Sequence, residues 1–125
     1  MREDSPTRFI KIRTPRPPKP DPYATALELA GAIHRVLEGA DKTRFHLKDR
    51  LDRCITSLIL QLARLNAVAK RGRWTYYRTA QNYLVDALAV LDILLAHKVN
   101  PRDDIEAART LAKRLSDELE PLAMG

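Results

Sequence analysis

Apolar residues recur at helical spacing along most of the chain. Between residues 43 and 71 they alternate by threes and fours, as in the seam of a helical bundle, at positions 47, 51, 54, 58, 62, 65 and 69. A helix of that length, about 28 residues, would extend roughly 40 Å. The same spacing recurs from about 74 to 98 at Tyr77, Ala80, Leu84, Leu88, Leu91 and Leu95. It recurs again from 101 to 120 at Ile105, Ala108, Leu111, Leu115 and Leu119.

A first helix is predicted from about 22 to 38. Its apolar residues lie on more than one side of the helix, at Leu27, Leu29, Ile33, Val36 and Leu37. We therefore expect neighbouring helices to cover it over a wide arc, as an inner element of the fold.

Capping residues mark where the first and last helices begin. Asp21 is followed by Pro22, and Asn100 by Pro101, so each pair offers a capping side chain and a proline for the first helical position. Acidic residues favour the first turns after Asn100, because they complement the helix dipole, at Asp103, Asp104 and Glu106.

The helix ends have their own signals. Gly39 follows the first helix, and Lys70 and Arg71 precede Gly72 at the predicted end of the second. Cations and a glycine are typical of a helix C-terminus. Pro121 is expected to end the last helix.

Short connections between helices of similar length predict an all-α fold. We expect residues 22–125 to form an up-down-up-down antiparallel four-helix bundle, with helices at about 22–38, 43–71, 74–98 and 101–120. The 125 residues are enough for one domain with a single core.

Residues 1–21 differ from the rest in composition. Six of the eight prolines lie within the first 22 residues, among six Lys or Arg side chains. This composition predicts an extended or disordered basic arm with polyproline II character. Phe9, Ile10 and Ile12 form an apolar patch in it, so two interpretations stay open: a solvated tail, or an arm that orders on a partner.

Charge is concentrated in one part of the chain. The formal net charge is +6, and residues 42–83 hold ten Lys or Arg against two acids, Asp49 and Asp52. Arg50, Ser57, Arg64 and Arg71 recur every seven residues, which predicts a basic stripe on the second helix. Such a surface suits nucleic acid, an anionic membrane or an acidic protein as partner.

Aromatic residues adjoin this charge at the start of the third helix. Trp74, Tyr76 and Tyr77 directly follow three cations. One interpretation is that cations hold phosphates while aromatic rings stack bases, and the other is that Trp74 and Tyr77 seal the end of the core. The candidate nucleic-acid-binding residues are Arg44, Lys48, Arg50, Arg53, Arg64, Lys70, Arg71, Arg73, Trp74 and Arg78.

Motifs that would indicate an enzyme are missing from the sequence. It has four glycines, no Gly-rich phosphate loop, no nucleophile elbow and no His-Glu-x-x-His, and its three histidines do not cluster. We expect no catalytic residues, metal or cofactor. The single cysteine, Cys54, falls on an apolar helical face and predicts a buried thiol in a reducing compartment. Without a signal peptide or an apolar run of about 20 residues, a cytoplasmic protein is expected, with no membrane partner.

One stretch carries a family resemblance. Thr43 to Leu51 contains Arg-Phe-x-Leu-x-x-Arg-Leu, and it is followed by Ala80 and by leucines at 84, 88, 91 and 94. This arrangement, over about residues 23 to 120, resembles the accessory variability determinant proteins of diversity-generating retroelements. The resemblance implies a basic four-helix bundle that assembles as a five-membered ring. It also implies a non-catalytic accessory role in mutagenic reverse transcription, with the reverse transcriptase and its template RNA as partners and DNA as a further candidate. Arg44 and Arg50 match by position.

A second functional class fits the same residues. A regulatory or antitoxin-like bundle, or a bundle of the type encoded by intervening sequences of ribosomal RNA genes, would use the basic face to bind an acidic protein. Charge does not separate this alternative from nucleic-acid binding.

Overall fold

The structure is a computed structural model that describes residues 21–40 and 44–124. Within these residues four α-helices pack against one another and no strand is present. They are α1 (Pro22–Gly39), α2 (Phe45–Ala63), α3 (Arg73–Ala96) and α4 (Arg102–Ala123). The predicted N-terminal arm lies outside the described residues, except for Asp21. The all-helical fold is confirmed.

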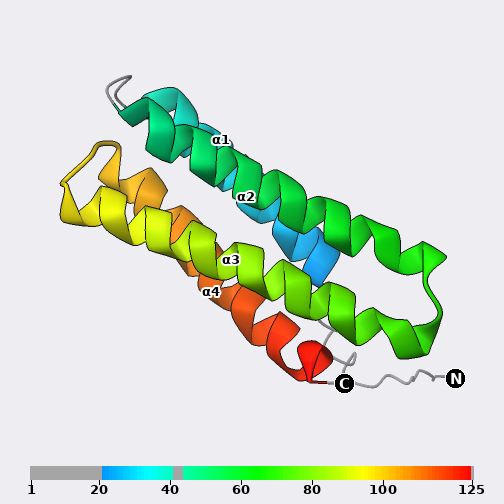
Figure 1. The fold of residues 1–125 in the computed structure, drawn as a ribbon. Helices are drawn as coiled ribbons and strands as arrows, with labels where there is room; N and C mark the ends of the chain where they lie inside the picture. Colours follow the sequence, from blue (N-terminus) through cyan, green and yellow to red (C-terminus); the bar gives the residue numbers. More distant parts are fainter. Residues whose placement is uncertain (1–20, 41–43, 125) are drawn as a thin grey trace, which may run out of the picture.

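Each helix packs against two others. α1 lies against α2 and α4, and α3 lies against the same two helices from the other side. Figure 1 shows the α2–α3 connection at one end of the bundle and the α3–α4 connection at the other. Buried apolar side chains fill the core between the helices. The largest of those with at most 1% exposure are Leu29, Ile33, Leu51, Leu58, Leu84, Leu91, Leu94, Ile105, Leu115 and Leu119.

The beginning of α1 agrees with the sequence. The Asp21 carboxylate accepts hydrogen bonds from the backbone N–H groups of Tyr23 (3.1 Å) and Ala24 (3.3 Å), and Pro22 occupies the first turn. The expectation that α1 is an inner element is wrong, because α1 contacts two helices rather than three. Leu27, on its outer side, is 47% exposed.

The prediction of one continuous second helix is also wrong. α2 ends at Ala63, and the chain continues as two short 3₁₀ helices, η2 (Arg64–Ala67) and η3 (Lys70–Gly72). Val68 and Ala69, between them, have extended backbones. Asn66 and Val68 have weak helix propensity, and Leu65 reaches the core without a continuing α-helix. Leu65 thus keeps its predicted contact with the core after the α-helix has ended, whereas Ala69, which was also predicted to face the core, is exposed.

Two prolines differ from their predicted roles in α4. Pro101 occupies the capping position and α4 begins at Arg102, so Asn100 is not the cap and no side chain caps this helix. Pro121 does not end the helix, which runs to Ala123. Its missing N–H falls in the last turn, and the buried Leu119 and Ala123 hold that turn against the core.

The segment Lys70–Ala96 is long and apolar enough by composition to cross a membrane, with a mean hydropathy of 1.3 in its most apolar stretch. One third of that stretch (33%) is buried. α3 places Leu84, Leu91 and Leu94 in the core, so packing in the bundle accounts for part of this apolar composition. The cytoplasmic location stays a prediction.

Candidate nucleic-acid interface

The predicted basic residues do not form one continuous stripe. Because α2 ends at Ala63, Arg64 caps its C-terminus and Arg71 belongs to η3, so neither continues the helical register of Arg50. The candidates fall instead into three places: the start of α2, the middle of the α2–α3 boundary, and the α2–α3 connection. Arg64 is exposed between the last two.

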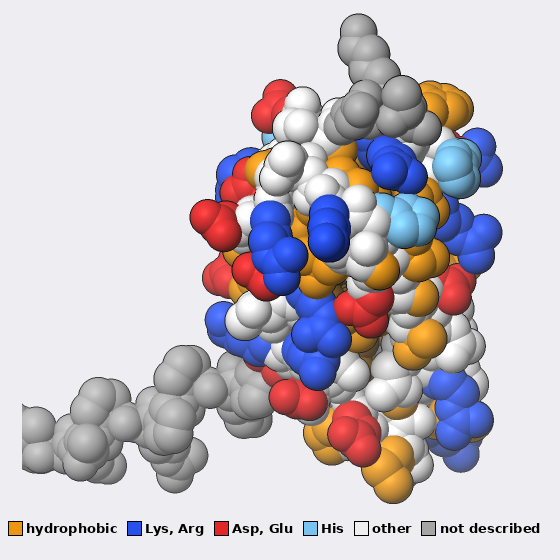
Figure 2. All heavy atoms as spheres, turned by 90° about the vertical axis from the view of Figure 1, so that its left-hand side faces the viewer, with side chains coloured by type: hydrophobic (Ala, Val, Ile, Leu, Met, Phe, Trp, Pro, Cys, Tyr) orange, Lys and Arg blue, Asp and Glu red, His pale blue; other side chains and the backbone are white. Residues whose placement is uncertain are grey.

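At the start of α2, the cations contact helix ends. A guanidinium nitrogen of Arg44 lies 3.1 Å from Nδ1 of His97, which caps α3, and Lys48 Nζ donates to the carbonyl of Ala40, which caps α1, at 3.2 Å. Cations near helix C-termini are favourable because they complement the helix dipole. Figure 2 views this end of the bundle and shows Lys and Arg interspersed with acids and histidines. The positive charge at this end is therefore not continuous, which makes it a poor surface for binding a polyanion.

In the middle of the bundle, the predicted cations are paired with acids. Nη2 of Arg50 lies 3.2 Å from Oδ2 of Asp86 on α3. Nε of Arg53 lies 3.0 Å from Oδ2 of Asp49, one turn earlier on α2. The hydrogen bond to Asp86 is the main reason that the pKa of Arg50 is raised above its ordinary value. Asp86 lies just beyond residues 42–83, so the charge count of that segment missed it.

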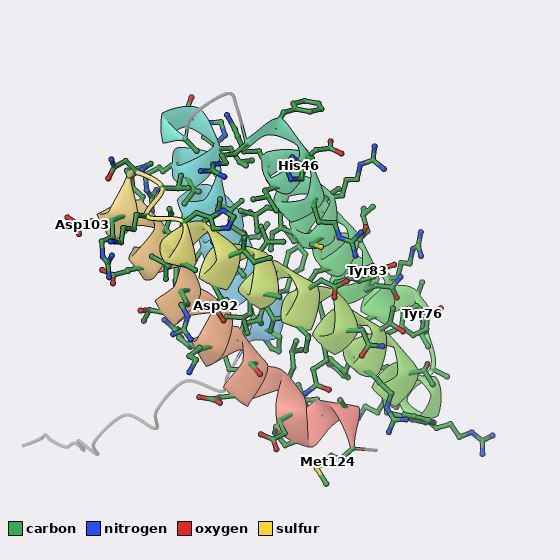
Figure 3. The ribbon with its side chains drawn as sticks, turned by 60° about the vertical axis from the view of Figure 1, so that its left-hand side comes forward. His46, Tyr76, Tyr83, Asp92, Asp103 and Met124 are labelled. Atoms are coloured by element: carbon green, nitrogen blue, oxygen red, sulfur yellow. The ribbon has the colours of Figure 1, made fainter. Side chains whose placement is uncertain are left out.

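A small hollow of about 220 Å³ adjoins these pairs, with Cys54, Ser57 and Tyr83 among its lining residues. Figure 3 shows Tyr83 at the boundary between α2 and α3. Cys54 is 4% exposed, which confirms the predicted buried thiol, and burial raises its pKa. A thiol with a raised pKa stays protonated and unreactive near neutral pH.

The remaining candidates meet in a groove at the α2–α3 connection, which we call the junction groove. Its volume is about 710 Å³, and its lining residues are Lys70, Arg71, Arg73, Trp74, Tyr77, Arg78, Leu122 and Met124. η3 and the first turns of α3 supply four cations, and the end of α4 supplies two apolar side chains. None of the lining residues that the structure describes is acidic. Figure 3 shows Met124 at the end of α4. Five predicted binding residues are thus brought together.

The two aromatic side chains of the groove differ in burial. Tyr77 packs against the core, as expected of a residue that seals the bundle. Trp74 is 38% exposed, and the guanidinium carbon of Arg78 lies 4.8 Å from its ring centroid, a cation–π distance. Trp74 is therefore available to a ligand.

The backbone adds positive potential to the junction groove. α3 begins beside it, with Gly72 in the capping position, no side-chain cap and no acid in its first turn. The Thr75 hydroxyl donates to the Gly72 carbonyl at 2.8 Å, and Arg73 Nε donates to the Val68 carbonyl at 3.2 Å. These contacts fix the loop beside the positive end of the α3 helix dipole.

Sequence reasoning missed two groove residues, Leu122 and Met124. Treating Pro121 as a helix end removed both from α4, and nothing local in the sequence links them to Trp74. An apolar spacing that continues through Leu119 to Ala123 was the signal that α4 extends further.

Comparison of the chain with protein-family models, with curated proteins and with solved structures finds no match. Among residues 21–40 and 44–124, no three His, Cys, Asp or Glu side chains gather as a metal site would require. The physical properties of the junction groove therefore carry the functional argument: a positively charged rim and an exposed indole favour a polyanion that also has planar apolar groups.

Proposed function

We propose that this protein is a non-catalytic accessory protein that binds nucleic acid, RNA first and DNA as a further candidate, through the junction groove. The observation that carries the proposal is the gathering of four cations around an exposed tryptophan, with no acid among the lining residues of 21–40 and 44–124. Phosphates neutralise the cations and release counterions, whereas bases contact the aromatic and apolar wall.

The finer part of the proposal rests on the resemblance to accessory variability determinant proteins. In it, the chain is an up-down-up-down antiparallel bundle with a basic N-terminal arm, and the positions of the described connections support that topology. It acts in the cytoplasm, beside the reverse transcriptase of a diversity-generating retroelement, as a five-membered ring. Arg44 and Arg50, matched by position, then serve mainly to hold α2 against α3, given their contacts with His97 and Asp86.

An exposed apolar face on α3, which no other described helix covers, supports assembly with other chains. Val85 is 61% exposed and Ile93 is 39% exposed, and Ala89 and Ala96 lie exposed on the same side of the helix. Apolar residues at this spacing suit a helix that packs against a further subunit or a polymerase.

Binding of a fluorescently labelled structured RNA tests the proposal. Lys70→Ala/Arg71→Ala should weaken binding about tenfold at moderate salt, because two phosphate contacts are lost. The matched control, Arg102→Ala/Lys113→Ala, removes the same net charge from exposed positions on α4 and should change affinity less than about threefold. Absence of binding by the unmodified protein, or equal losses in the two variants, would overturn the proposal.

The second candidate is a protein-interaction bundle, regulatory or antitoxin-like, that binds an acidic protein. The apolar wall of Leu122 and Met124 beside four cations is the observation that favours it. Tighter binding of an acidic, apolar peptide than of RNA would select this candidate. A monomeric or dimeric mass in solution would also support it, since the finer part of the first proposal includes a five-membered ring.

A further inference from the structure

We infer that the junction groove takes an unpaired nucleotide, so the protein prefers single-stranded nucleic acid to duplex. This inference rests on the proposed nucleic-acid binding and names the form of nucleic acid that the groove accepts. It depends on three features of the groove: the stacked Trp74–Arg78 pair, the apolar wall from α4, and the position of the cations.

The Trp74–Arg78 pair is a stacking platform. The guanidinium carbon of Arg78 lies 4.8 Å from the centroid of the Trp74 ring. Trp74 is nevertheless 38% exposed to solvent. Both groups are planar, and nucleobases stack on aromatic rings and on guanidinium planes. The faces of bases inside a duplex are covered by their neighbours, so a duplex offers such a platform no base except at its two ends.

The part of the groove that α4 supplies is apolar. Leu122 is 37% exposed and Met124 is 76% exposed, both at the end of α4. A phosphate gains nothing from these side chains, whereas a base removes their surface from water and contacts the polarizable sulfur of Met124. A duplex presents phosphates and sugars on its outside, so it would leave Leu122 and Met124 exposed to water.

The cations flank the platform along the chain. Lys70, Arg71 and Arg73 lie within four consecutive positions that lead directly into Trp74. A strand whose base lies on the platform would therefore have its neighbouring phosphates beside these cations and the start of α3. The groove volume of about 710 Å³ falls within the range of small-ligand sites, about 300–1,000 Å³, which suits nucleotides better than a double helix.

The chain contains a single tryptophan, Trp74, so tryptophan fluorescence reports on the junction groove alone. The experiment titrates the unmodified protein, at low salt, with a single-stranded oligonucleotide containing 5-bromouracil and with a blunt duplex of the same length. We expect quenching of Trp74 and tighter binding for the single strand, and little quenching for the duplex. Trp74→Ala should weaken single-strand binding about 5- to 100-fold, with Trp74→Phe retaining most of the affinity, because stacking needs a ring rather than an indole.

The outcomes separate the two levels of inference. Equal affinity for both forms, or single-strand binding without quenching, would refute the preference for an unpaired base while nucleic-acid binding stands. No binding of either form would refute the proposed function itself. The quenching measurement needs no substitution, so it does not depend on the folding of a variant.

Discussion

The salt dependence of single-strand binding can be calculated from the charges of the junction groove. Four cations line it, at positions 70, 71, 73 and 78. For a single strand, the logarithm of the binding constant falls with the logarithm of salt concentration with a slope of about −0.7 per neutralised phosphate, so four contacts give about −2.8. Raising salt from about 50 to about 200 mM should then weaken binding about 50-fold.

Removing two of these cations changes the slope by a calculable amount. Lys70→Ala/Arg71→Ala leaves two contacts and a slope of about −1.4, so the same rise in salt should weaken binding only about sevenfold. Fluorescence anisotropy at four salt concentrations measures the slope of each variant. Circular dichroism should show unchanged helical content, because both residues lie in η3 rather than in an α-helix.

Two comparisons make the calculation refutable. Arg102→Ala/Lys113→Ala, away from the groove, should keep the slope within about 0.5 of the original value. Arg50→Ala/Arg53→Ala should change it less than the groove variant does, because these two cations already contact Asp86 and Asp49. If Arg50 and Arg53 set the slope and Lys70 and Arg71 do not, the phosphates lie along α2 and the groove assignment is wrong.

Three further predictions concern stability. In a urea titration, Gly31→Ala should raise the free energy of unfolding by about 0.5–1 kcal/mol, since nothing lies within 4 Å of the new Cβ. Gly39→Ala should lower the free energy of unfolding by about 1–3 kcal/mol, because its Cβ would lie 2.8 Å from Cγ of Pro101. Equal effects at the two glycines would contradict the close packing at Gly39. Asp21→Ala should cost about 1 kcal/mol through the lost cap, measurable as a lower thermal midpoint, and an unchanged midpoint would mean that the cap contributes nothing. Burial raises the pKa of Cys54, so above about pH 8.5 the unfolded chain loses the thiol proton before the folded protein does, and the free energy of unfolding falls with rising pH. Cys54→Ala should therefore lose less stability above that pH than the unmodified protein does. Parallel profiles of stability against pH for the two proteins would contradict this expectation.

Periodicity predicted which residues face the core better than where the backbone is helical. Leu51, Cys54, Leu58 and Leu62 are buried as expected. Leu65 also packs against the core, yet it does so from η2. A pattern of apolar positions records contact with the core, and a 3₁₀ turn at the end of a bundle can satisfy that contact as well as an α-helix does. The break at Ala63 was therefore not visible in the apolar spacing.

The charge pattern needed the fold for its interpretation. Arg50 is neutralised by Asp86, which is 36 residues away in the sequence but lies on the adjacent helix. Arg53 and Asp49, one turn apart, were both within the predicted basic block, so their pairing could be anticipated. Pairs within a helix follow from sequence spacing, whereas pairs between helices depend on how the helices are placed.

The early end of α2 both breaks the predicted stripe and creates the junction groove. In one continuous helix, Arg71 would follow Arg64 along α2 at the same seven-residue spacing. The extended residues Val68 and Ala69 instead redirect the chain, so that η3 places Lys70 and Arg71 beside Trp74 and Arg78. The continuation of α4 past Pro121 then adds Leu122 and Met124 to the same place. A substitution that extends α2, such as Val68→Ala with Asn66→Ala, should therefore weaken single-strand binding without removing any cation. Unchanged affinity in a variant with measurably higher helical content would show that the groove does not depend on this break.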